Sequence, residues 1–95
     1  MLTQKEIDII IETLKPYNPK RIGIFGSVAR NEEKIFSDID ILYNFDSPIS
    51  LFVKYRLLEA LKNKLYKKID LVSEKAIHFE IKKYIYNDLK VIYEP

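Results

Sequence analysis

The sequence contains no cysteine and a single histidine. Disulfides, thiolate metal sites and cysteine nucleophiles are therefore excluded, and a histidine-rich metal site or a Ser/His/Asp triad has little to draw on. No apolar run approaches the roughly 20 residues needed to cross a bilayer. The first residues, from Met1 to Glu6, are too polar for a signal peptide. We therefore expect a cytoplasmic protein whose chemistry depends on carboxylates and backbone amides.

The composition is that of a globular chain with little charge excess. Of the 95 residues, 47% are hydrophobic and 32% charged, which predicts a single domain over residues 1–95 with one core. The net charge of +2 is too small to indicate nucleic acid, so direct nucleic-acid binding is not expected. Four lysines nevertheless lie close together, which indicates either a solvated helix face or a surface for an acidic partner or polyphosphate. They are Lys62, Lys64, Lys67 and Lys68.

The order of the secondary-structure signals predicts an α/β fold. Thr3 and Glu6 form a capping box that opens a first helix, and Pro16 and Pro19 stop it. Strands are predicted over residues 21–25, 39–45 and 68–72, and residues 91–93 are either a strand or a helical end. Strands that alternate with helices form a sheet with helices packed over it.

Three helices are predicted after the first strand. The first is one or two turns over residues 28–31. Ser50 caps a long helix, and Ser73 opens the last one. Spacing predicts the buried stripes of the two longer helices as Leu51, Tyr55, Leu58, Leu61 and Leu65, and as Ile77, Ile81, Tyr84 and Ile85. His78, near the start of the last helix, is expected to be a surface or capping residue.

Gly26-Ser27 lies between the first predicted strand and the short helix. Ser27 is a natural N-cap, and the amides of Val28 and Ala29 would face outward at the positive end of the helix dipole, where phosphate binds. An ordinary strand-to-helix turn can have the same sequence. Arg30 favours phosphate, because a cation at the third helical position is unfavourable unless an anion lies beside it.

Asp38 and Asp40 stand at the entry of the second predicted strand. Residues i and i+2 of a strand share a face, so the two carboxylates project side by side, about 6.5 to 7 Å apart along the backbone. Such carboxylates repel each other, and Mg²⁺, a hard cation that prefers oxygen ligands, would relieve the repulsion. A solvated pair at a strand edge is the alternative. Ser37 either orients Asp38 or is an ordinary loop serine.

Asp70 is the third acidic candidate. An aspartate within a short apolar strand is unfavourable for β-structure. If this strand neighbours residues 39–45, Asp70 adds a third carboxylate to Asp38 and Asp40. Three carboxylates facing a phosphate-binding helix terminus describe a two-metal site for phosphoryl or nucleotidyl transfer.

Together these residues resemble the signature of the nucleotidyltransferase superfamily typified by DNA polymerase β: Gly26-Ser27, ten intervening residues, then Asp38-x-Asp40. The segments GSVAR at 26–30, SDID at 37–40, IDLV at 69–72 and VIYEP at 91–95 are similar to its minimal nucleotidyltransferase branch. The resemblance covers nearly the whole chain. Asn31 departs from the glycine usual in that branch, but asparagine tolerates the left-handed conformation better than most residues.

The resemblance implies a small mixed β-sheet flanked by helices, a nucleoside triphosphate such as ATP as substrate, and two Mg²⁺ ions. By analogy, Asp38 and Asp40 would hold both ions, and Asp70 would complete the site of the ion that activates the attacking hydroxyl. Gly26 and Ser27 would hold the β- and γ-phosphates. All three acidic positions are filled here, so the resemblance implies an active enzyme.

Members of this branch are commonly antitoxins paired with HEPN-domain RNase toxins, in which they adenylylate a tyrosine. The predicted elements leave no insertion to wrap an acceptor, so we expect the acceptor to bring its own binding surface. The expected function is Mg²⁺-dependent transfer of AMP from ATP to a hydroxyl of a HEPN-domain toxin, in a hetero-oligomer. The alternatives are a transferase acting on a small molecule or nucleic acid, and a non-catalytic antitoxin that neutralises its partner by binding.

Overall fold

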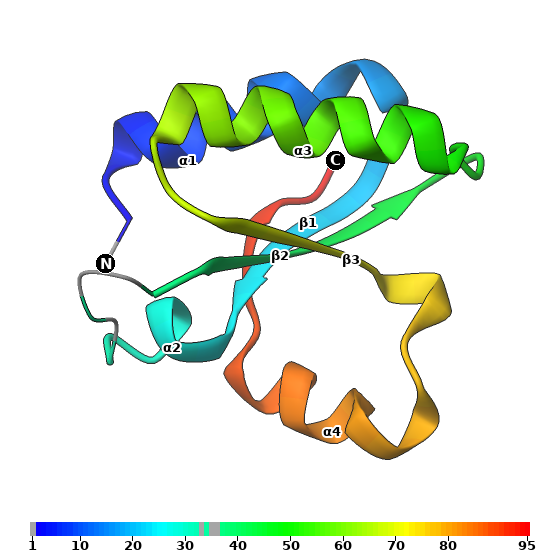
Figure 1. Cartoon of the computed structure of the whole chain (residues 1–95). Coiled ribbons are helices and arrows are strands. Elements are labelled where there is room, and N and C mark those ends of the chain that lie inside the picture. The colour runs from blue at the N-terminus through cyan, green and yellow to red at the C-terminus, as the bar shows by residue number, and fades with distance from the viewer. Residues whose placement is uncertain (1, 33, 35–36) are drawn as a thin grey trace.

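A computed structural model describes residues 2–32, 34 and 37–95, and these form a four-stranded sheet with helices on both sides (Figure 1). The strand order is β3-β2-β1-β4. β2 and β3 run parallel, while β1 is antiparallel to both β2 and β4, which confirms the expected mixed sheet. The elements in chain order are α1 (Gln4–Leu14), η1 (Lys15–Tyr17), β1 (Pro19–Phe25), α2 (Gly26–Ala29), β2 (Ile39–Phe45), α3 (Leu51–Leu65), β3 (Ile69–Ser73), η2 (Glu74–Ala76), α4 (Phe79–Asp88) and β4 (Lys90–Tyr93).

Local sequence signals determine where the two long helices begin, and these helices cover one face of the sheet. The Thr3 hydroxyl accepts from the backbone N–H of Glu6, whose carboxylate accepts from the backbone N–H of Thr3, so the predicted capping box is confirmed. Ser50 caps α3 by accepting from the backbone N–H of Val53 at 3.1 Å. A cap of this kind contributes about 1 kcal/mol, because it satisfies a helical N–H that has no other partner.

Alternation of side chains gives the sheet two different faces. The face toward α1 and α3 carries the apolar core: Ile22, Ile24, Ile39, Ile41, Tyr43, Phe45, Ile69 and Leu71 from the strands, and Ile10, Leu14, Leu57, Leu61 and Leu65 from the helices. The intervening residues, among them Asp40 and Asp70, lie on the opposite face. In Figure 1 that face is turned toward α4. The acidic residues are therefore placed on the side that the two long helices do not cover.

The buried stripe predicted for α3 is wrong in its first half. Leu51 is 76% exposed and Tyr55 is 63% exposed, whereas Leu57 is buried together with the correctly predicted Leu61 and Leu65. Spacing alone cannot distinguish these registers, because the chain has apolar residues on both sides of the helix. Burial depends on which turns of α3 lie over the sheet and α1.

The last helix begins later than expected. Ser73 ends β3 and is followed by the short 3₁₀ turn η2, and α4 starts only after His78, whose Nδ1 accepts from the backbone N–H of Glu80 at 3.3 Å. His78 is thus a capping residue, as expected. Of the predicted stripe, Ile85 is buried, but Ile81 is 49% exposed and Tyr84 is 65% exposed.

Two of the four clustered lysines contact α1. Lys67 forms an ion pair with Glu6 at 3.2 Å, and the Lys64 ammonium donates to the hydroxyl of Thr13 at 3.3 Å. These contacts hold the end of α3 against α1 and favour the interpretation as a partly solvated helix face. Within the described ranges, no helix is long and apolar enough to span a membrane.

Candidate active site

Asp40 lies between two other strands at the start of β2. Its backbone pairs with Phe25, the last residue of β1, on one side and with Asp70 of β3 on the other. The parallel register therefore sets the Asp40 and Asp70 residues directly opposite each other on the face away from the core. The condition set for Asp70, that its strand neighbours residues 39–45, is therefore met, and Asp70 lies beside Asp40.

Gly26 borders the Asp40 carboxylate from the other side. A Cβ on Gly26 would overlap with Oδ2 of Asp40, and the backbone of Gly26 has a φ of +75°, which residues with a side chain rarely adopt. Glycine is therefore required here twice, for its conformation and for its size. The start of α2 and the carboxylate of Asp40 can approach each other because no side chain stands between them.

The Asp40 carboxyl is the most electrostatically perturbed acid of the site. Burial, together with the negative charges of Asp70 and Asp38, raises its pKa to about 6, and the positive charge of Arg30 opposes this only in part. Asp40 is half-buried, whereas Asp38 and Asp70 are exposed. The folded protein therefore holds a carboxylate that is unfavourable to ionise without a cation.

The three aspartates share one end of the sheet but do not form a finished coordination shell. Among the described residues, no group of three His, Cys, Asp or Glu side chains is close enough together to hold a metal ion. The donor set nevertheless fits Mg²⁺, since it consists of carboxylate oxygens that repel one another, with open space at the two exposed members. Binding of a divalent cation would require their side chains to converge.

Ser27 is not the N-cap of α2. The helix begins one residue earlier, at Gly26, with Phe25 as its N-cap and no side-chain capping bond. The expectation failed because Gly26 itself adopts the conformation that turns the strand into the helix. Ser27 is the second residue of a four-residue helix, half-buried, and its carbonyl accepts from the backbone N–H of Glu32 at 2.9 Å.

Arg30 is not at the third helical position but is the C-cap of α2. A cation is favourable at that end, so the argument from the helix dipole does not apply. Its guanidinium instead binds two carboxylates: Nε donates to Glu32 at 3.0 Å and Nη1 donates to Asp88 at 2.5 Å. The hydrogen bonds that its guanidinium donates to Glu32 and Asp88 raise the pKa of Arg30. A role of Arg30 in nucleotide binding stays a prediction.

Asp88, the last residue of α4, was not singled out from the sequence. It connects α4 to Arg30 across 58 positions of the chain, so no local pattern contains the pair. One signal was present: an acidic residue at the C-terminal end of a helix is unfavourable with respect to the dipole, which indicates a cationic partner elsewhere. Asn31 follows Arg30 with a φ of 59°, as expected for the residue that replaces glycine.

Ser37 has a role in the loop before Asp38. Its hydroxyl accepts from the backbone N–H of Lys34 at 2.7 Å, and its own backbone N–H donates to the carbonyl of Lys34 at 3.0 Å. These contacts are those of a turn-forming serine. They favour the interpretation as a loop serine over that of a residue which orients Asp38.

A second polar cluster connects α4 to the face of the sheet that carries Asp40 and Asp70. The buried carboxylate of Glu74 accepts from Arg21, from the Tyr86 hydroxyl at 2.7 Å and from Asn44 at 3.2 Å. Burial would raise the pKa of Glu74, but the hydrogen bonds from Arg21, Tyr86 and Asn44 outweigh it and lower the pKa. The carboxylate is satisfied by its neighbours, so this cluster is a structural connection.

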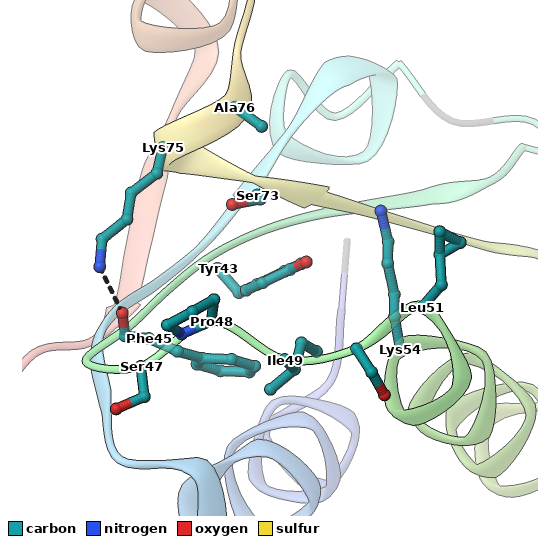
Figure 2. Close-up of a pocket in the computed structure, with 11 residues that line it drawn as sticks. Tyr43, Phe45, Ser47, Pro48, Ile49, Leu51, Lys54, Ser73, Lys75 and Ala76 are labelled. Atoms are coloured by element: carbon teal, nitrogen blue, oxygen red, sulfur yellow. Dashed lines mark hydrogen bonds between the residues drawn. The ribbon is translucent and has the colours of Figure 1, made fainter.

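The hollow in Figure 2 lies at the other end of β2 and lacks the candidate acids. It has a volume of about 460 Å³ and is lined mainly by Tyr43, Phe45, Pro48, Ile49 and Leu51, with Lys75 donating to the carbonyl of Phe45 at 2.7 Å. No carboxylate is among the described residues that line it. The three candidate aspartates therefore lie away from this hollow, at the opposite end of β2.

Known sequences are similar to this chain over most of its length. Residues 8–95 match the polymerase beta nucleotidyltransferase family. A provisionally named protein adenylyltransferase of Methanocaldococcus jannaschii, MJ0126, is 42% identical over 95 residues, which cover 94% of this chain and 97% of that protein. Protein adenylyltransferase MntA of Thermococcus cleftensis is 34% identical over 94 residues, covering 94% of this chain and 95% of MntA.

Solved structures show the same fold. A provisionally assigned minimal nucleotidyltransferase has a TM-score of 0.79 and 26% identity, and the match covers 92% of this chain and 89% of that chain. A toxin–antitoxin complex solved with AMP-PNP gives a TM-score of 0.85 at 21% identity, over 94% of this chain and 73% of that one. A complex of a tri-AMPylated Shewanella oneidensis HEPN toxin with its MNT antitoxin gives 0.80 at 20% identity, over 99% and 74%.

Proposed function

The chain belongs to the polymerase beta nucleotidyltransferase family, and on that premise we propose that it transfers AMP from ATP to a hydroxyl of a partner protein. We propose a HEPN-domain toxin as the partner, so that the chain acts as an antitoxin. The observation that carries the proposal is the alignment of 94% of the chain with proteins named as protein adenylyltransferases, at 42% and 34% identity. Complexes of the same fold with HEPN toxins support the choice of partner.

We propose that residues 1–95 form one catalytic domain, which carries the site. Asp38 and Asp40 would hold two Mg²⁺ ions, and Asp70 would complete the site of the one beside the acceptor hydroxyl. When bound, such ions neutralise charge on the triphosphate and help to deprotonate the hydroxyl. Burial, together with repulsion from Asp70 and Asp38, raises the pKa of Asp40, and this unfavourable negative charge supports a cation at this place.

The remaining roles belong to the turn at the start of α2. Gly26 has no side chain at the point where it meets Asp40. The triphosphate can therefore approach the backbone of Gly26 closely. Gly26 and Ser27 would hold the β- and γ-phosphates. In the reaction, the acceptor oxygen forms a bond to the α-phosphorus, the bond from that phosphorus to the bridging oxygen breaks, pyrophosphate leaves, and the hydroxyl proton passes to solvent.

The test is incubation of the full chain with α-labelled ATP, Mg²⁺ and the HEPN-domain protein encoded beside it, followed by intact mass measurement. We expect the HEPN-domain protein to gain AMP units. Asp38→Asn with Asp40→Asn should abolish the gain, whereas Asp46→Asn, at an exposed position beyond the far end of β2, should not. Label on RNA or a metabolite, or neutralisation that persists in the double variant without label, would contradict the proposal.

A further inference from the structure

The outer surface of α4 is unusually apolar for a helix that is mostly exposed. Phe79 is 85% exposed, Tyr84 is 65% exposed and Ile81 is 49% exposed, while only Ile85 of the ten residues of α4 is buried. A shallow groove on this surface is lined by four apolar or aromatic residues, Phe79, Ile81, Tyr84 and Tyr86, together with Glu80, Lys82 and Lys83. Large exposed aromatic side chains that are grouped in this way are typical of surfaces that bind another molecule.

Several contacts place α4 on the catalytic side of the sheet. Leu89, directly after α4, lies where a side chain on Gly23 of β1 would be. Asp88 binds Arg30, the residue that follows α2, and Tyr86 binds Glu74, the residue that follows β3. Figure 1 shows α4 on the side of the sheet opposite α1 and α3. The exposed surface of α4 therefore borders the face that carries Asp40 and Asp70.

We propose that α4 is the surface on which the acceptor protein docks, with Phe79 and Tyr84 as its apolar anchors. The inference rests on the proposed function, because an acceptor hydroxyl must reach the carboxylates. It can do so only from the face of the sheet that α1 and α3 leave open. A protein seated on α4 lies next to that face and is in contact with the helix whose end binds Arg30.

The charges on α4 define the chemistry of the acceptor surface. Lys82 and Lys83 are exposed beside the carboxylate of Glu80, and the Lys83 ammonium lies 5.3 Å from the ring centroid of Tyr84. The other carboxylate of α4, that of Asp88, is paired with Arg30 at the end of the helix. The acceptor surface that fits is an apolar patch with an acidic rim, since the two ammonium groups outnumber the carboxylate of Glu80. Anchor residues at the centre of such an interface carry most of the binding free energy.

The chain contains a matched control surface on α3. Phe52 is 72% exposed and Tyr55 is 63% exposed, and the Arg56 guanidinium lies 5.9 Å from the ring centroid of Phe52. α3 packs on the opposite side of the sheet from Asp40. Both pairs are aromatic, exposed and near a cation, so they differ chiefly in their position relative to the site.

The experiment compares two double variants. The α4 variant combines Phe79→Ala and Tyr84→Ala, and the α3 variant combines Phe52→Ala and Tyr55→Ala. Binding of the adjacent-gene HEPN-domain protein is measured by calorimetry without ATP, and AMP labelling is measured separately. For the α4 variant we expect at least about tenfold weaker binding and a correspondingly higher KM for the acceptor. Affinity for ATP with Mg²⁺ and the melting temperature should not change. The α3 variant should resemble the wild type in all four measurements.

The outcomes separate this inference from the proposed function. Wild-type affinity in the α4 variant, or an equal loss in the α3 variant, overturns the docking surface while leaving AMP transfer intact. Binding that depends on Phe79 and Tyr84 without any labelling of the acceptor supports the surface and contradicts AMP transfer. If light scattering shows that the α4 substitutions dissociate a homodimer without changing the affinity for the HEPN-domain protein, the surface mediates self-association and the inference is wrong.

Discussion

Replacement of Asp40 by asparagine should stabilise the protein in metal-free buffer, and only at neutral or alkaline pH. The pKa of Asp40 rises from 3.8 to about 6 on folding. Because the folded pKa is raised, the ionised form disfavours the folded state. The penalty is fully present above about pH 6, decreases as the pH falls, and is absent below about 3.8. The asparagine of the variant keeps the shape of the side chain and carries no charge at any of these pH values.

The expected magnitude follows from that difference in pKa. Taken at face value it corresponds to about 3 kcal/mol, and solvent screening around the half-buried carboxyl reduces it to about 1 kcal/mol. In EDTA at about pH 8, the free energy of unfolding of Asp40→Asn should therefore exceed that of wild type by about 1 kcal/mol, and the difference should be largely gone by about pH 4. With Mg²⁺ and ATP the order should reverse, because the variant binds them less well.

Urea denaturation followed by circular dichroism across this pH range, with and without Mg²⁺ and ATP, measures both effects. Asp46→Asn is the matched control: Asp46 is exposed and its ion pair with Lys20, at 3.7 Å, is a weak surface contact. Its effect should be close to zero at every pH. If Asp40→Asn instead destabilises the protein equally at every pH, Asp40 is held by structural hydrogen bonds, and the reasoning from burial and repulsion of its charge is refuted.

Two other substitutions test the surroundings of Asp40. Gly26→Ala should abolish AMP transfer and lower the stability by about 1–2 kcal/mol, because its Cβ overlaps with Asp40 at a positive φ. Gly23→Ala is the control: its Cβ would meet Leu89 and not Asp40, so it should lower the stability while kcat is retained. AMP transfer by Gly26→Ala would contradict the requirement for glycine at position 26. Asp88→Asn should tighten ATP binding by about fivefold in calorimetry, because it removes a carboxylate that competes for Arg30. Weaker binding would instead mean that Asp88 positions Arg30.

The parts of the fold that were predicted correctly depend on short sequence segments. The capping box of Thr3 and Glu6, the N-cap at Ser50 and the β-branched run from Ile39 to Phe45 each contain their signal within a few residues. The position of Asp70 beside Asp40 was expected only on the condition that their strands are neighbours, and the parallel pairing of β2 with β3, two strands joined by one helix, meets that condition.

The errors concern features that depend on tertiary packing. Leu51 and Tyr55 have the spacing of a buried stripe, but the first turns of α3 extend beyond the core. The position of Ser27 within α2 depends on the positive φ of Gly26, which no spacing rule indicates. The partner of Arg30 lies 58 residues away, at Asp88, so only the folded chain reveals it.

The pairing of β4 with β1 also determines when during synthesis the molecule can finish folding. β1 emerges from the ribosome long before β4, yet Gly23 pairs with Val91 and Ile24 pairs with Lys90, so this half of its hydrogen bonding waits until residues 90–93 have been synthesised. Contacts between such distant residues form slowly. A nascent chain thus carries Asp38, Asp40 and Asp70 before α4 can be held against the sheet. Under the proposed function, an antitoxin chain would modify a toxin only after β4 has been synthesised.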